Sequence, residues 1–315
     1  GLDGVREILQ KPDSRGSIPL GFGRYNSRLM QRITGALLIA LSAAAFGTLA
    51  IFGRYAYAAG MDTFTVLFLR FSLASMVMAI LLVARRESLP RGKILAQLIG
   101  MGALGYVGQS FLYLTAINYA SAGLVALLLY LYPCFVLILS VIVFRERVTR
   151  VKVVALTLAL FGTALTVDPQ GGQTIGALMA ITAAAIYSVY IIVGANVMKH
   201  VSAVQSSTVI FASAGAVFGT MTLFNGVHFP IHDSGWLTVA GIVLIATVIP
   251  VVSFLAGLER VGPTNAAMLS TLEPVVTVVL GASLFGEQLS PIGLAGGGLI
   301  LLAVLLLTRS EMSAP

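Results

Sequence analysis

The sequence predicts an all-α polytopic membrane protein, with ten transmembrane helices arranged as two inverted five-helix repeats. Three observations lead to this fold class. The chain of 315 residues is 58% hydrophobic and only 10% charged, whereas charged residues make up about 25% of soluble domains. Apolar runs of about 20 residues, long enough to cross a bilayer, recur along most of the chain. The chain also aligns with itself, without gaps, at an offset of 141 residues.

Ten apolar windows give the predicted spans, and the connections between them are short. Residues 1–32 are mixed in charge and are interpreted as a cytoplasmic polar tail. The first five-helix repeat is expected over residues 33–167 and the second, inverted repeat over residues 174–308. The ten windows are 33–53, 64–84, 94–117, 121–144, 149–167, 174–195, 204–225, 236–258, 264–285 and 290–308.

The basic residues sort to one side of this ten-span arrangement. Apart from Arg54 and Arg70, all of the 19 Lys and Arg residues lie in the tail, in alternate loops or at the matching span ends. Cytoplasmic loops are the ones that carry an excess of Lys and Arg, so both termini are expected in the cytoplasm. The net charge of +7 then reflects membrane topology, and no nucleic-acid partner is expected.

The self-alignment matches residue types that rarely coincide by chance in an apolar sequence. Pro133 pairs with Pro274, and Glu146 pairs with Glu287. Because five is an odd number, tandem five-helix copies enter the membrane from opposite sides. Many secondary transporters share this architecture and bind substrate near the midplane, where the two copies meet. One duplicated chain contains both halves, so a functional monomer is expected.

Each copy also contains a proline-centred helix that ends in Phe-x-Glu, within ‘SAGLVALLLYLYPCFVLILSVIVFRERVT’ and ‘TNAAMLSTLEPVVTVVLGASLFGEQLS’. Together with the arginine of ‘FLRFSLA’ (Arg70), these features resemble the drug/metabolite transporter superfamily, in its ten-helix EamA-type exporters, over residues 33–308. The chain as a whole is most similar to bacterial amino-acid exporters of the YddG type. The resemblance implies export of small metabolites across the bacterial inner membrane, through a central cavity and by alternating access, without a cofactor.

Two charged residues lie inside predicted spans, where a charge must face a cavity or a partner. Glu273 has Tyr132 as its repeat partner. It is either a proton relay or ligand for a substrate amine, or a structural residue that hydrogen-bonds to a neighbouring helix. Arg70, whose repeat partner is Phe211, is expected to pair with Glu273 or with helix-end carbonyls. A structural role of Arg70 is favoured over direct binding of a substrate carboxylate.

Three prolines within the spans are expected to shape the cavity. Pro133 and Pro274 each free a backbone carbonyl at equivalent places, which predicts matched kinks. Pro250, in the eighth span, is expected to add a further kink. These prolines and Arg70 form the predicted structural or gating set.

Aromatic and amide side chains cluster in the spans that should line the cavity. Tyrosine hydroxyls in hydrocarbon need polar partners, so several should face a polar interior. Such a wall suits zwitterions with apolar or aromatic side chains. Tyr106 is left open between the cavity and an aromatic belt at the membrane interface. The predicted substrate-binding residues are Phe46, Gln109, Tyr113, Tyr130, Tyr132, Tyr187, Tyr190 and Glu273.

The predicted function is therefore a secondary transporter that exports small metabolites, with amino acids favoured and drugs or other metabolites as the alternative. A membrane-embedded enzyme needs a nucleophile with a base, or a metal cluster. His200, His228 and His232 all fall in loops, so neither a catalytic residue nor a metal site is expected. A channel would need a charged ring or a carbonyl filter, and the sequence contains neither. The expected partners are a small-molecule substrate and the lipid bilayer, and coupling to protons is left open.

Overall fold

The computed structural model describes residues 20–116, 119–120, 125, 128–166, 174–285 and 291–313, and these residues form helices without a strand among them. Seven described helical runs are long and apolar enough to cross a membrane. Two shorter apolar helices, Tyr132–Phe144 and Pro291–Leu307, accompany them. Part of the predicted fourth span lies outside the described residues, so the count of ten stays a prediction.

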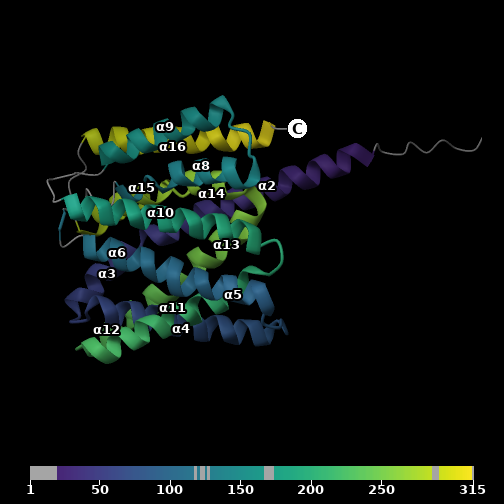
Figure 1. Cartoon of the computed structure of the whole chain (residues 1–315). Helices are drawn as coiled ribbons and strands as arrows, with labels where there is room; N and C mark the ends of the chain where they lie inside the picture. Colours follow the sequence, from purple (N-terminus) through teal and green to yellow (C-terminus); the bar gives the residue numbers. More distant parts are fainter. Residues whose placement is uncertain are drawn as a thin grey trace, which may run out of the picture.

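The helices run side by side as one bundle (Figure 1). The first half of the chain forms α2 (Leu20–Gly47), α3 (Leu49–Ala58), α4 (Thr63–Ala84), α5 (Gly92–Gly100), the π-helix η1 (Met101–Tyr106), α6 (Val107–Ala116), α8 (Tyr132–Phe144) and α9 (Arg150–Thr166). The second half forms α10 (Thr174–Val197), α11 (Ala203–Asn225), α12 (Asp233–Val243), the π-helix η2 (Leu244–Val248), α13 (Ile249–Val261), α14 (Pro263–Leu269), α15 (Leu272–Phe285) and α16 (Pro291–Ser313).

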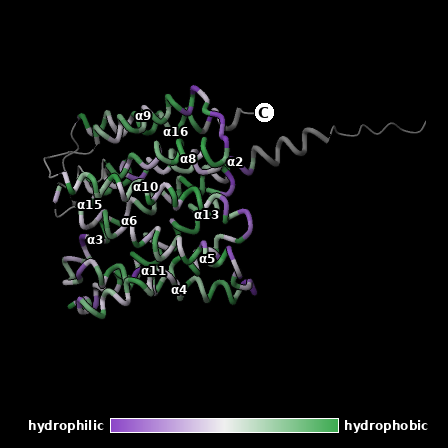
Figure 2. Tube along the Cα trace, in the orientation of Figure 1, coloured by the Kyte–Doolittle hydropathy of each residue, from purple (hydrophilic) through white to green (hydrophobic). Residues whose placement is uncertain are grey.

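The surface of the bundle is apolar along its length. Hydrophobic residues follow the helices, and hydrophilic residues gather at the bundle ends (Figure 2). Ile80, Leu104 and Leu237 are 69%, 74% and 76% exposed. Apolar exposure on this scale is stable in lipid and would aggregate in water. The N-terminal end of α2 and the C-terminus lie at the same end of the bundle (Figure 1), the arrangement expected if both termini face the cytoplasm. Because α2 begins at Leu20, the first helix starts before the predicted tail ends, and most of that tail lies outside the described residues.

The principal helix pairs join the two halves of the chain. The helix α4 packs on α11, and α9 packs on α16 at the opposite side of the bundle (Figure 1). Between these pairs, α2 packs on α13 and α15, while α10 packs on α6 and α8. The contact between the halves is therefore the core of the molecule. Its largest buried side chains include Phe71 and Phe218, whose rings stack with centroids 5.7 Å apart.

Two membrane-crossing runs contain a π-helical segment, which inserts an extra residue into the turn and bends the helix. The segment η1 spans Met101–Tyr106, and η2 spans Leu244–Val248. Shifting η1 by the repeat offset places it over residues 242–247, so the two π-helices occupy matching places in the two halves.

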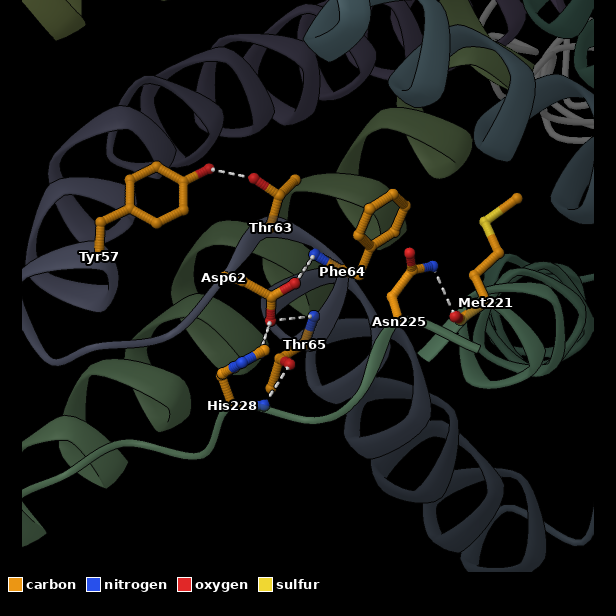
Figure 3. A network of polar contacts seen from close by, with 8 residues as sticks. All are labelled: Tyr57, Asp62, Thr63, Phe64, Thr65, Met221, Asn225 and His228. Carbon is orange, nitrogen blue, oxygen red and sulfur yellow. Dashed lines mark hydrogen bonds and ion pairs between the residues drawn. The ribbon is translucent and has the colours of Figure 1, made fainter. Parts of the chain in front are cut away.

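One end of the α4–α11 pair is fastened through the N-terminus of α4 (Figure 3). The Asp62 carboxylate caps this helix by accepting hydrogen bonds from the N–H groups of Phe64 and Thr65, each 3.2 Å long. The loop that follows α11 places the Nδ1 atom of His228 3.4 Å from this carboxylate, and the N–H of His228 donates to the Thr65 hydroxyl at 2.9 Å. Partial burial raises the pKa of Asp62, but these hydrogen bonds and the nearby His228 together hold it below its usual 3.8.

At the opposite end of the pair the two helices exchange roles, and the loop after α4 contacts the N-terminus of α11. Ser202 caps α11 by accepting from the N–H of Gln205, and its hydroxyl donates to the carboxylate of Glu87 in the loop after α4. The Gln205 amide donates to the carbonyl of Ser88 at 2.7 Å. Glu87 and His228 are separated by the repeat offset. Equivalent loop positions therefore contact the N-cap residue of the neighbouring helix, Ser202 at one end of the pair and Asp62 at the other.

Candidate functional site

Glu273 lies where the predicted ninth span is broken into two helices. The first, α14, ends at Leu269, and α15 begins at Leu272 after a turn in which Thr271 donates to the Met268 carbonyl. Pro274 follows directly and has no N–H to leave unsatisfied, so it is accommodated in the first turn of a helix. The sequence predicted a kink inside one helix at Pro274. The structure instead shows a break, with the proline at the start of the second segment.

The helix α8 begins at Tyr132, so Pro133 lies in its first turn, as Pro274 does in α15. Pro250 is placed differently, because it lies inside the continuous helical run Asp233–Val261, directly after the π-helix η2. Its carbonyl accepts a hydrogen bond of 2.8 Å from the Ser42 hydroxyl. Pro133 and Pro274 therefore start helix segments, and the gating role of the three prolines stays a prediction.

The Glu273 side chain is partly buried in the first turn of α15, where the helix dipole favours a negative charge. Among the described residues, no group donates a hydrogen bond to its carboxylate. Its backbone carbonyl accepts from the Thr277 hydroxyl at 3.2 Å, and the same hydroxyl lies 3.1 Å from the carbonyl of Gly47. The main chain of α15 is therefore fixed against α2, while the carboxylate keeps its hydrogen-bonding capacity.

A chain of tyrosine rings runs beside Glu273, from α8 and the turn before it, through α10, to η1. Tyr132 lies between Tyr130 and Tyr187, with centroid distances of 6.4 and 4.9 Å. Tyr190 continues the chain at 5.8 Å from Tyr187, and Tyr106 ends it at 5.7 Å from Tyr190. The structure thus brings four of the predicted tyrosines together and adds Tyr106, which the sequence left open. We call these five residues the tyrosine chain.

The tyrosine chain lies within electrostatic range of the Glu273 carboxylate. Glu273 interacts with the hydroxyls of Tyr106, Tyr130, Tyr132 and Tyr187, and also with that of Tyr113 on α6. Phe46 on α2 and Gln109 on α6 are also partly buried. Among the described residues, neither has a hydrogen bond or ring contact to this group, and Gln109 instead accepts from the Ser110 hydroxyl at 3.2 Å.

Exposure divides the predicted binding residues into two kinds. Tyr132 and Tyr190 are only 3% and 4% exposed. The Tyr132 hydroxyl donates to the Ala267 carbonyl of α14 at 3.3 Å, so this residue braces the broken helix that carries Glu273. Tyr113, Tyr130 and Tyr187 keep part of their surface accessible. A ligand of Glu273 would contact these three tyrosines.

Arg70 is 5% exposed, and its guanidinium binds the π-turn of η2. Its Nε donates to the Thr247 hydroxyl at 2.7 Å, and Nη2 lies 3.4 Å from the carbonyl of Ala246. The guanidinium also lies 4.9 Å from the centroid of the Phe71 ring. The sequence led to the expectation of Glu273 or helix-end carbonyls, whereas the observed partners are a hydroxyl and a carbonyl inside the helical run Asp233–Val261. Arg70 and Glu273 interact over a longer distance, and no ion pair joins them among the described residues.

Arg70 also lies between the two π-helices. The guanidinium that bonds to η2 lies 6.0 Å from the ring centroid of Tyr106 in η1. Tyr106 and Thr247 are related by the repeat offset, so Arg70 lies beside equivalent residues of the two halves. The sequence did not identify Thr247, although its alignment with a membrane-buried tyrosine was the one available signal.

Among the described residues, no group of three or more His, Cys, Asp and Glu side chains is placed to hold a metal ion.

Comparison with known proteins places the chain in a family. The family model of EamA-like transporters matches residues 33–168 and again residues 174–309. An uncharacterized transporter of Archaeoglobus fulgidus is 29% identical over 275 residues, which cover 87% of this chain and 96% of the relative. YcbK of Bacillus subtilis, also named an uncharacterized transporter, is 25% identical and covers 86% of this chain and 92% of its own. YedA of Escherichia coli, named an uncharacterized inner membrane transporter, is 25% identical and covers 78% of this chain and 81% of its own.

The protein in one solved crystal structure has a fold similar to that of this chain. It is 21% identical in sequence, has a TM-score of 0.78, and covers 87% of this chain and 98% of its own. The two family matches span most of the chain, and seven described helical runs are long and apolar enough to cross a membrane. The chain therefore belongs to the EamA-like transporter family, as a multi-pass transporter of the inner membrane.

Proposed function

We propose that this protein is a secondary transporter that exports small amphipathic metabolites carrying an amine, with amino acids that have apolar or aromatic side chains as the first candidates. The observation that carries the proposal is the Glu273 carboxylate, which lies between the two halves without a hydrogen-bond donor among the described residues. An intramembrane acid is costly unless it binds a proton or a cationic group. The adjacent tyrosines offer aromatic faces and hydroxyls to the rest of the substrate.

Alternating access is the proposed mechanism, and the helix packing supports it. The contact of α2 with α13 corresponds, under exchange of the halves, to the contact of α10 with α6. The contact of α15 with α2 corresponds in the same way to that of α8 with α10. Two halves that pack in the same way, as the proposed inverted repeats 33–167 and 174–308 would, can exchange conformations. The site would then open to each side of the membrane in turn.

A cytoplasmic contact of Glu146 is the proposed point at which this exchange is controlled. Its carboxylate receives the Lys152 ammonium at 2.6 Å and the Thr264 hydroxyl at 2.6 Å. These bonds join the end of α8 to the starts of α9 and α14, and α14 leads directly to Glu273. Opening the site toward the cytoplasm would require this contact to break.

The test is counterflow in liposomes that contain the purified chain. Vesicles are loaded with one unlabelled compound, and uptake of a labelled amino acid or amine is measured with and without a pH gradient. We expect uptake that depends on the internal compound. Flux of drugs or nucleotide sugars, with none of any amine-bearing compound, would contradict the proposed substrate. A rate that is independent of the pH gradient would identify facilitated export, and a dependent one would identify protons as a coupled partner.

A further inference from the structure

The site proposed above contains an accessible acid, and the question is whether it also contains an accessible base. An amino acid carries a carboxylate as well as an amine, and burying that carboxylate without a partner is costly. Positive charge inside a membrane protein comes from two sources, basic side chains and the N-terminal ends of helices.

Arg70 is the only basic side chain deep within the predicted spans. Every other Lys and Arg lies in the tail, in a loop or near a span end, and the three histidines lie in loops. Arg70 is 5% exposed, its guanidinium bonds to Thr247 and Ala246, and the Tyr106 ring lies 6.0 Å away. A substrate carboxylate could bind it only by displacing its bonds to η2.

In the described part of the chain, the first turns of the two helices beside the site, α8 and α15, have their donors reduced as well. The helix α8 has Pro133 in its first turn, and the next N–H, that of Cys134, donates to the Leu131 carbonyl at 3.0 Å. The helix α15 has Pro274 in its first turn, and the N–H of Glu273 donates to a carbonyl three residues earlier at 3.0 Å. Proline removes one donor from each turn. The Glu273 carboxylate itself occupies the positive end of α15.

The remaining groups favour a cation. Tyr130 and Tyr187 keep part of their aromatic surface exposed, and the faces of aromatic rings attract ammonium groups. A second carboxylate bound in this space would be repelled by Glu273, and this repulsion is strong where water is scarce. An ammonium group gains from Glu273 and the tyrosine rings, whereas a carboxylate finds no free positive partner among the residues that the structure describes.

We infer that the preferred substrates are organic amines with an apolar or aromatic body and no free carboxylate, ahead of the zwitterionic amino acids. This inference rests on the proposed binding of an amine at Glu273, and it places amines without a carboxylate ahead of the amino acids named first above. Amines of this kind are the products of amino-acid decarboxylation or the esters and amides of amino acids. The charge balance at Glu273 and Arg70, and not the shape of the aromatic wall, sets the selectivity.

Three compounds with the same phenyl body separate the two charges. They are phenethylamine with the amine alone, phenylalanine with both groups, and 3-phenylpropionate with the carboxylate alone. Binding of each to the purified full-length chain is measured by isothermal titration calorimetry at pH 7. Calorimetry in detergent avoids the passive leak of amines across liposomes. We expect phenethylamine to bind at least about tenfold more tightly than phenylalanine, and 3-phenylpropionate not to bind.

Two variants make the result specific. Glu273→Gln should abolish the binding of phenethylamine while the purified protein still elutes as a single folded species. Glu259→Gln removes an acid near the cytoplasmic end of α13, outside the site, and should leave the binding unchanged. Phenylalanine binding as tightly as phenethylamine, in a manner that needs Glu273, would overturn the inference and leave the proposed function standing. Binding of none of the compounds would overturn both.

Discussion

Replacing Thr247 with valine tests whether Arg70 stabilises the junction of the two π-helices. The change keeps the size of the side chain and removes one oxygen. That oxygen accepts the Arg70 Nε–H at 2.7 Å and donates to the Ile242 carbonyl at 2.7 Å, and the residue is 0% exposed. The variant therefore leaves a buried, charged N–H without its acceptor.

The size of the effect follows from the charge and burial of the donor. A hydrogen bond to a charged group contributes about 1.5–3 kcal/mol, and an unsatisfied buried donor costs a similar amount. We expect Thr247→Val to lower the free energy of unfolding by about 2 kcal/mol. For a chain of this size that corresponds to a fall of several degrees in Tm.

The assay is thermal unfolding of the purified protein in detergent, followed by the fraction that remains soluble and monodisperse. Thr182→Val is the matched control, because Thr182 is exposed on α10 and its hydroxyl bonds only to the Leu178 carbonyl of its own helix. We expect this control to change stability by less than about 0.5 kcal/mol. Thr247→Ser, which keeps the hydroxyl, should retain most of the stability that Thr247→Val loses. Equal Tm values for the two valine variants would refute the role assigned to Arg70.

Three further predictions concern packing, the cytoplasmic contact and pH. Gly162→Ala places a methyl group 2.7 Å from a backbone carbonyl of α16 and should lower Tm by several degrees. The control Gly297→Ala meets nothing within 4 Å and should leave Tm unchanged. Equal Tm values for the two variants would contradict the close packing of α9 on α16. Glu146→Gln weakens the charge-assisted cytoplasmic contact and should change the counterflow rate at unchanged substrate affinity; a pure affinity change would argue against control of the exchange. The pKa of Asp62 is lowered by folding, so its carboxylate stabilises the folded state above pH 3.8, and this stabilisation is lost as the pH falls through the lowered pKa. Between pH 5 and 3, the Tm of Asp62→Asn should therefore fall less than the Tm of the native chain. Parallel curves of Tm against pH would contradict the role of Asp62 as a cap.

The class of fold and the location of the site follow from the sequence because both depend on properties that single residues carry. A membrane span is visible as a run of apolar residues, and an acid or tyrosine within such a run is visible as an exception. Glu273 and four tyrosines of the tyrosine chain were predicted on this basis, and the structure places them together. Their role in binding stays a prediction.

The details that the sequence did not predict depend on how segments far apart in the chain pack together. The partner of Arg70 is Thr247, 177 positions away, and only the crossing of α4 with η2 brings them together. The π-helices are hidden because one extra residue per turn hardly alters the apolar pattern. The three prolines were interpreted as kinks because a proline within an apolar run is typical of both a bent helix and the start of a second one.

Counterflow with the Glu273 variant is the most direct test of the central claim, that the free carboxylate of α15 binds the substrate amine. Liposomes with the native chain, Glu273→Gln or Glu259→Gln are loaded with the same amino acid, and the initial uptake of its labelled form is compared at equal protein content. The account predicts uptake by the native chain and by Glu259→Gln, and none above empty liposomes by Glu273→Gln. Native rates in the Glu273→Gln protein would contradict it.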